Sequence, residues 1–200
     1  MTIIVVEGLD KSGKHSISEF MQGLFVEKGK SCIHMEFPRY DTPYGSLIRG
    51  YLSGTIDMDK RVFELMQSAD KLDAQRDILA ASDMYDYIIM DRYIHTQLVY
   101  GLYNNPDKKD WLYSLIDGIK KPDYVLYLDV DPKVSMSRKG QHGDNDKYES
   151  DIELLSGVAA LYKDVLANET DSIVTTIDAN QPFGDVIIDA TKYVNRHFFY

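Results

Sequence analysis

The sequence predicts a three-layer α/β fold in which helices flank a parallel sheet of five strands. Five short runs of apolar and β-branched residues recur along the chain, and longer segments with helical periodicity separate them. Alternation of strands and helices is typical of βαβ units and of a parallel sheet. The chain has 200 residues and contains no repeat or linker that would divide it. We therefore expect one domain over residues 1–200.

The predicted strands are short and nearly continuous in apolar residues, which suits strands buried on both faces. They cover residues 3–6, 32–37, 87–90, 124–128 and 173–177. Helical patterns cover residues 14–28, 59–82, 147–166 and 185–193. The second of these places apolar side chains on one face, namely Val62, Leu65, Met66, Ala69 and Leu72. The polar segment 138–146 contains two glycines and is expected to be a mobile loop.

The charge balance argues against several classes of partner. Lys and Arg number 22 against 32 Asp and Glu, a net charge of −10. A general nucleic-acid binder needs a basic face, so nucleic acid is not an expected partner, although a small anionic ligand needs only a local basic pocket.

Cysteine usage and hydropathy indicate the compartment. Cys32 is the single cysteine, so no disulfide can form within the chain and a reducing, cytoplasmic location is expected. No apolar run approaches the ~18 residues of a membrane span, and residues 1–7 lack the basic start of a signal peptide.

A phosphate-binding loop follows the first predicted strand. Gly8, Gly13 and Lys14 have the G-x4-GK spacing of a P-loop, with Ser12 inside it. Glycines let successive backbone N–H groups point at phosphate oxygens, and the next helix adds its positive end. Lys14 is expected to reach the β and γ phosphates of a nucleotide.

One position departs from this motif. The hydroxyl residue that normally binds Mg²⁺ is His15 here, and Ser16 follows it. Mg²⁺ prefers oxygen ligands, so water completes its shell, or Ser16 shifts, or His15 contacts phosphate. The departure also leaves open a nucleotide-binding module without catalysis.

Further motifs resemble the thymidylate kinase family of P-loop nucleoside monophosphate kinases over essentially the whole chain. They are Val6-Glu7-Gly8-Leu9-Asp10, Phe37-Pro38-Arg39, Ser68-Ala69-Asp70-Lys71, Asp91-Arg92-Tyr93, Asp129-Val130-Asp131-Pro132 and Asp146-Lys147-Tyr148-Glu149. The resemblance implies a P-loop kinase fold with a short lid at about 138–148. It also implies phosphoryl transfer from ATP, with Mg²⁺, to a pyrimidine deoxynucleoside monophosphate, first of all dTMP.

The same resemblance implies residue roles. Lys14 and Arg138 would contact the donor nucleotide, and Lys11 would contact the transferred phosphoryl group. Arg92 would lie between the donor and acceptor phosphates, and Asp10 would accept a hydrogen bond from the sugar 3′-hydroxyl. These five residues form the expected catalytic set. ATP contacts are expected at Gly8, Lys11, Ser12, Gly13, Lys14, His15, Ser16, Arg138 and Asn180, the last near adenine. Acceptor contacts are expected at Asp10, Phe37, Arg39, Tyr40, Gln67, Lys71, Arg92, Thr96 and Tyr148. Asp91, through water, and Ser16 are the expected metal residues.

Three acceptor positions depart from the family pattern. Gln67 stands where the family stacks a phenylalanine on the base, and Lys71 stands where it has an arginine. The arginine of the family's Phe-Pro-x-Arg falls on Tyr40, with Arg39 one step earlier. A kinase for dUMP or a 5-substituted dUMP therefore remains an alternative.

Another alternative is a deoxynucleoside kinase, with Glu7 or Glu36 as a base. The family resemblance also implies a homodimer packed through helices, and residues 98–103 are a candidate interface. Six basic residues are expected around one cleft of an otherwise acidic chain, namely Lys11, Lys14, Arg39, Lys71, Arg92 and Arg138.

Overall fold

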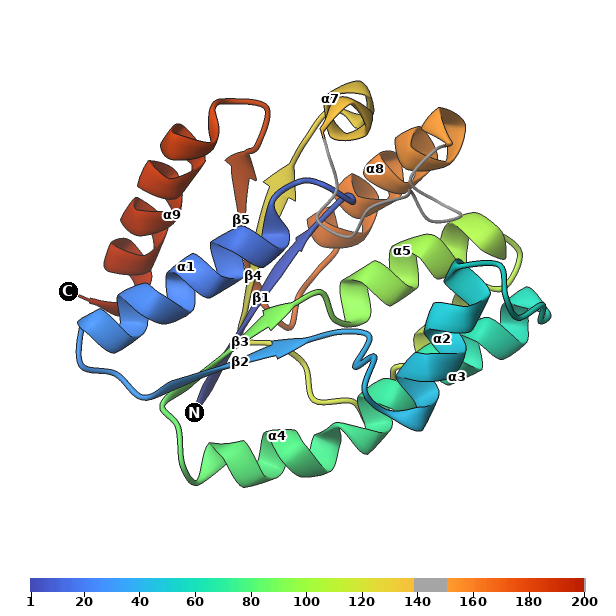
Figure 1. The fold of residues 1–200 in the computed structure, drawn as a ribbon, viewed down its shortest axis with the longest axis horizontal. Helices are drawn as coiled ribbons and strands as arrows, with labels where there is room; N and C mark the ends of the chain where they lie inside the picture. Colours follow the sequence, from blue (N-terminus) through green and yellow to red (C-terminus); the bar gives the residue numbers. More distant parts are fainter. Residues whose placement is uncertain (139–150, 200) are drawn as a thin grey trace.

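The computed structural model describes residues 1–138 and 151–199, and it confirms the α/β fold with a five-stranded parallel sheet (Figure 1). The strand order is β2-β3-β1-β4-β5. Helices α1 and α9 lie together on one face of the sheet, and α5 and α8 pack on each other on the opposite face. Residues 139–150, which include most of the expected lid and Tyr148, lie outside the described residues.

The five strands begin and end close to the predicted positions. They are β1 Thr2–Gly8, β2 Cys32–Glu36, β3 Tyr87–Asp91, β4 Tyr124–Asp129 and β5 Ile173–Asp178. The central strands β1 and β4 are almost entirely buried, as their unbroken apolar runs require. Register pairs Val6 with Asp91 and Glu36 with Asp91, so the carboxyl ends of β1, β2 and β3 meet at one edge. Ligands of open α/β sheets bind at this edge.

The described residues form helices between and after the strands. Their bounds are α1 Lys14–Glu27, α2 Pro43–Leu52, α3 Lys60–Asp73, α4 Gln75–Ser82, α5 Ile94–Asn104, α6 Lys109–Ser114, α7 Pro132–Ser137, α8 Ile152–Ala167 and α9 Phe183–Phe198. The first part of the predicted helix 147–166 falls outside the described residues.

The single helix predicted at 59–82 is wrong, because α3 and α4 are separate helices that meet at Ala74. Much of the predicted apolar face of α3 also points away from the core, although Met66 packs against it. Val62, Leu65 and Leu72 are 43%, 44% and 47% exposed, whereas the buried face carries Glu64 and Lys71 among others. Periodicity identifies an apolar face but not the direction in which it points.

Helices α2, α5, α6 and α7 were not predicted from the sequence, although two of them carry clear start signals. Thr42 caps α2 by accepting a hydrogen bond from the Gly45 N–H, with Pro43 as the first helical residue. Asp131 caps α7 in the same way before Pro132. A capping side chain followed by proline is a standard signature of a helix start.

Residues 98–103, the candidate dimer interface, belong to the interior of the chain. Leu98, Val99, Tyr100 and Leu102 in α5 are buried, and α5 packs against α8. This stretch therefore cannot form a surface between subunits. Among the described residues, no helix has the length and apolar character that spanning a membrane would require.

Candidate active site

The P-loop curls at the carboxyl end of β1, the strand in the middle of the sheet. Gly8, Lys11 and Gly13 all have positive φ angles, of 153°, 59° and 96°. A Cβ on Gly8 would lie 2.7 Å from the Leu128 carbonyl oxygen, so only glycine fits between β1 and β4 at this point. The loop delivers Lys14 into the first turn of α1.

Lys14 is buried within this loop. Its Nζ donates a hydrogen bond of 2.5 Å to the Leu9 carbonyl oxygen. Burial has the largest effect on Lys14 and, together with the nearby Arg92 cation, lowers its pKa to about 8. The carboxylates of Asp10, Asp91 and Glu7 act in the opposite direction. The lysine therefore lies inside a network of charges built from β1, β3 and the loop.

Arg92 follows β3 and forms an ion pair with Asp10 of the P-loop. Arg92 has a φ of 63°, in the left-handed region that few residues other than glycine adopt. Burial opposes ionisation of Asp10, but Arg92 and Lys14 together lower its pKa to about 2. Tyr100 of α5 donates a 2.9 Å hydrogen bond to the other carboxylate oxygen of Asp10. Positive and negative charges thus lie side by side where β1 and β3 end.

Arg138 connects the P-loop to the far end of the sheet. Its guanidinium donates to the carbonyl oxygens of Lys11 at 3.2 Å, Ser12 at 3.5 Å and Ala179 at 2.5 Å. Asn180, next to Ala179, accepts a 2.7 Å hydrogen bond from the Asp131 N–H and thereby ties β5 to the start of α7. Arg138 therefore lies beside the loop, whereas Asn180 is bonded to the ends of β4 and β5 and the start of α7.

Lys71, Gln67 and Phe37 come together on the acceptor side. The Lys71 Nζ lies 3.0 Å from the Gln67 Oε1 and 5.8 Å from the centre of the Phe37 ring. Burial lowers the pKa of Lys71 to about 8, although Asp70, Glu64 and Glu7 act in the opposite direction. Burial also raises the pKa of Glu64 to about 8. The residues expected to bind the base are therefore neighbours in space.

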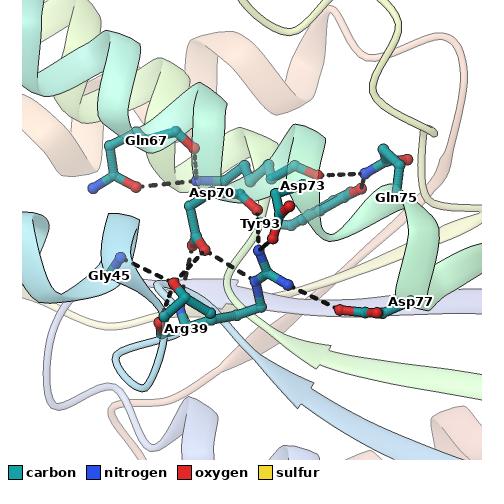
Figure 2. Close-up of polar contacts among 10 residues, drawn as sticks. Arg39, Gly45, Gln67, Asp70, Asp73, Gln75, Asp77 and Tyr93 are labelled. Carbon is teal, nitrogen blue, oxygen red and sulfur yellow. Dashed lines mark hydrogen bonds and ion pairs between the residues drawn. The ribbon is translucent and has the colours of Figure 1, made fainter.

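Arg39 is held by three aspartates of α3 and α4 (Figure 2). Its guanidinium lies 2.9 Å from Asp70, 2.7 Å from Asp73 and 3.0 Å from Asp77. A ligand phosphate at Arg39 would compete with these carboxylates, so its contact with the acceptor stays a prediction. Tyr40 lies under the Arg49 guanidinium, 4.4 Å from ring centre to carbon.

Glu7 is a buried carboxylate that organises the segment after β3. Its oxygens accept hydrogen bonds from the Tyr93 N–H at 2.9 Å, the Thr96 hydroxyl at 2.5 Å and the Tyr162 hydroxyl at 3.0 Å. Glu7 is 0% exposed, so it is not placed to deprotonate a nucleoside hydroxyl. The Thr96 hydroxyl, an expected acceptor contact, points to Glu7 in this structure.

Comparison with known proteins decides the family. The family model described as thymidylate kinase matches residues 6–189 of the chain. The chain belongs to the thymidylate kinase family. It is similar to thymidylate kinase of Schizosaccharomyces pombe, with 28% identity over 98% of this chain and 93% of the relative. A thymidylate kinase of Caenorhabditis elegans is 33% identical over 69% of this chain and 67% of the relative.

A solved structure shows the same fold. Thymidylate kinase from Candida albicans superposes with a TM-score of 0.80 at 22% identity, over 98% of this chain and 91% of that chain. The P-loop and the Asp91-Arg92-Tyr93 segment, two of the motifs that carried the family resemblance, lie side by side at the carboxyl edge of the sheet.

The position that departs from the P-loop motif faces two carboxylates. The Nδ1 of His15 lies 3.4 Å from the Asp91 Oδ2 and 3.9 Å from the Glu36 Oε2. The two carboxylates offer oxygen atoms that suit Mg²⁺, whereas the imidazole nitrogen does not. Asp91, an expected metal residue, belongs to this group, and the role of Ser16 stays a prediction.

Proposed function

We propose that the chain transfers the γ-phosphoryl group of ATP to the 5′-phosphate of dTMP, which gives ADP and dTDP. The observation that carries this proposal is the meeting of Lys14, Arg92 and Asp10 at one edge of the sheet in a member of the thymidylate kinase family. An acceptor phosphate oxygen attacks the γ-phosphorus, and the bond from that phosphorus to the β–γ bridging oxygen breaks. The acceptor is already an anion, so no general base is needed.

Each charged residue has a part in the proposed reaction. Lys14 neutralises the β and γ phosphates, with Lys11 beside it in the loop. Arg92 neutralises the charge shared between donor and acceptor, where a correctly placed cation has its greatest effect. Asp10 holds Arg92 and is also the expected partner of the sugar 3′-hydroxyl. Arg138 holds the loop from the donor side through the Lys11 and Ser12 carbonyl oxygens.

We include Mg²⁺ in the proposal as the companion of ATP. When bound, it would neutralise phosphate charge, and Asp91 and Glu36 are the carboxylates on this side of the P-loop that suit it. A cytoplasmic location also remains part of the proposal, on the basis of the single cysteine.

The experiment that tests the proposed reaction is coupled ADP release with a panel of acceptors. The panel contains dTMP, dUMP, 5-hydroxymethyl-dUMP and thymidine, each at several concentrations. We expect the highest kcat/KM with dTMP. Faster ADP release with thymidine than with any monophosphate would replace the proposal with a deoxynucleoside kinase. ATP binding without ADP release for any acceptor would leave a nucleotide-binding module.

We expect Gln67→Phe to lower the KM for dTMP about fivefold. An aromatic ring stacks on a base with about 1 kcal/mol or more, and an amide provides no such platform. The change also removes the Oε1 that lies 3.0 Å from the Lys71 Nζ. Steady-state kinetics at saturating ATP measures the effect, and Gln67→Leu is the matched control because it removes the amide without adding a ring. An unchanged or higher KM for Gln67→Phe, or an equal gain with Gln67→Leu, would mean that residue 67 does not face the base.

We also propose a homodimer that is formed through the outward apolar face of α3, defined by Val62, Leu65 and Leu72. This face replaces the buried 98–103 stretch as the candidate interface. A second copy would cover three apolar side chains that are each more than two-fifths exposed.

Leu65→Glu should convert the dimer to a monomer, because the interface would then bury an unpaired charge. Sedimentation velocity of the wild type and variant at equal concentration measures the change. Ile188→Glu is the control, because Ile188 is 51% exposed but lies on α9. A monomeric wild type, or a dimer that survives Leu65→Glu, would contradict this interface.

A further inference from the structure

His15, Glu36 and Asp91 form a cluster of metal-ligating side chains in three different elements. His15 lies in the first turn of α1, Glu36 ends β2 and Asp91 ends β3. Within residues 1–138 and 151–199, one ligand atom from each of them can be chosen so that all three lie within 4.8 Å of one another. Sheet register fixes part of this arrangement, because Glu36 and Asp91 are direct neighbours in the parallel ladder.

The innermost member of the cluster lacks a hydrogen-bond partner. Asp91 is 4% exposed, and its Oδ1 is buried with no hydrogen-bond partner among the described residues. Buried carboxylate oxygens are normally paired, because desolvation without a partner costs free energy. Lys14 and Arg92 interact electrostatically with Asp91, but neither accounts for this oxygen with a hydrogen bond. The other oxygen, Oδ2, faces the His15 Nδ1 at 3.4 Å, so the carboxylate has an unpartnered oxygen beside the one that faces the cluster.

The cluster is reachable from solvent. His15 and Glu36 line a cavity of about 550 Å³ beside the segment that follows β2. Their side chains are 35% and 44% exposed, whereas the Asp91 side chain is 5% exposed. A cation bound here would be held by three protein ligands and keep its outer positions open to water.

The donor set decides which cation fits. One imidazole and two carboxylates give a mixed nitrogen and oxygen set with a charge of −2 when the imidazole is neutral. Imidazole suits first-row transition metals, and a purely oxygen-loving cation such as Mg²⁺ gains little from it. Lys14 and Arg92 are the cations that interact with Asp91. Arg92 is paired with Asp10, and the two carboxylates of the cluster outweigh the repulsion from Lys14.

We propose that His15, Glu36 and Asp91 bind a divalent transition cation, of the class of Mn²⁺ and Zn²⁺, in the nucleotide-free protein. The histidine at the P-loop position that normally carries a hydroxyl thus changes the metal preference of the site. The alternative is an ordinary ion pair between a protonated His15 and Asp91, with Glu19 at 3.4 Å from the other ring nitrogen. A metal site binds a divalent cation, whereas the ion pair does not, so metal binding separates the two alternatives.

Metal binding to the full chain without nucleotide tests the proposal. Chelator-treated protein is titrated with Zn²⁺ by calorimetry and with Mn²⁺ by electron paramagnetic resonance, each with Mg²⁺ as competitor. We expect one equivalent per chain, with Zn²⁺ bound more tightly than Mn²⁺ and Mg²⁺ at least ~10-fold more weakly than Mn²⁺. Spin-echo modulation of the bound Mn²⁺ should show one imidazole nitrogen.

Variants assign the ligands. His15→Ser and Glu36→Gln should each weaken Mn²⁺ and Zn²⁺ binding at least ~10-fold, and His15→Ser should remove the nitrogen modulation. Glu19→Gln is matched to Glu36→Gln, because Glu19 also lies near His15 but outside the cluster, and it should bind as the wild type does.

Two results would overturn the proposal. One is the lack of a stoichiometric site for Mn²⁺ and Zn²⁺ in the wild type, and the other is wild-type affinity or nitrogen modulation in His15→Ser. The wild-type spectrum is decisive even if a variant fails to fold. Because no nucleotide is present, these results do not depend on which acceptor the kinase uses.

Discussion

Replacing Arg92 with alanine should lower kcat about a thousandfold at saturating ATP and dTMP, while the affinity for ATP changes little. Cations that neutralise transferred phosphoryl groups contribute 10³-fold or more to such reactions, which is about 4 kcal/mol of barrier. Arg92 stands where β3 ends and pairs with Asp10 across from Lys14. Its removal leaves the donor lysine in place but takes away the charge between donor and acceptor.

The measurement combines steady-state kinetics with nucleotide binding by calorimetry. Arg92→Lys is the matched control, because it keeps the positive charge but loses the fork that can bind two oxygens at once. We expect its kcat to lie between those of the wild type and Arg92→Ala. Normal turnover at saturation, together with weakened ATP binding, would place Arg92 on the donor side and contradict this role.

Replacing Glu7 with alanine should lower the free energy of unfolding by about 3–4 kcal/mol. This would leave the Tyr93 and Thr96 N–H groups and the Thr96 and Tyr162 hydroxyls without their buried acceptor. The two hydroxyls lie 2.8 Å apart and can bond to each other, so the two N–H groups carry the loss, at about 1.5–2 kcal/mol each. Glu7→Gln keeps one acceptor oxygen and the shape of the side chain, so its loss should be smaller. These bonds connect β1 to the segment that carries Arg92.

Urea unfolding at constant pH measures the change through the transition midpoint and slope. Glu27→Ala is the control, because Glu27 is an exposed glutamate at the end of α1 and should change the unfolding free energy by less than about 0.5 kcal/mol. A loss of less than about 1 kcal/mol for Glu7→Ala would mean that water or rearranged side chains satisfy these donors.

The sheet could be predicted from sequence because each strand has a local signal. A run such as Ile3–Val6 places apolar side chains on both faces of its strand, so both faces must be covered. Strands in the centre of a parallel sheet are covered in this way. The direction of α3 could not be predicted in this way. Its inner face carries Glu64, Ser68 and Lys71. Lys71 bonds to Gln67 of its own helix, but Ser68 also pairs with Gln97 of α5, a contact that no local pattern reveals.

The same difference separates the two halves of the site. Gly8, Gly13 and Lys14 are close in sequence, and their spacing alone describes a phosphate loop. The aspartates that hold Arg39 lie at least 31 residues along the chain from it, and no local pattern connects them. The only sequence signal for the role of Glu7 is that a charged residue ends an apolar run. The structure explains it, because Glu7 is a buried acceptor of hydrogen bonds.

The order of the strands also indicates which part of the sheet fluctuates most easily. β1, which carries the P-loop, is covered by β3 and β4 on its two sides, whereas β5 is an edge strand with several solvent-exposed positions. We therefore expect amide exchange through local fluctuations to be slower in β1 than in β5, which ends next to Asn180. Fraying of the β5 edge would loosen the region expected around adenine while the charges that act on the phosphates keep their positions.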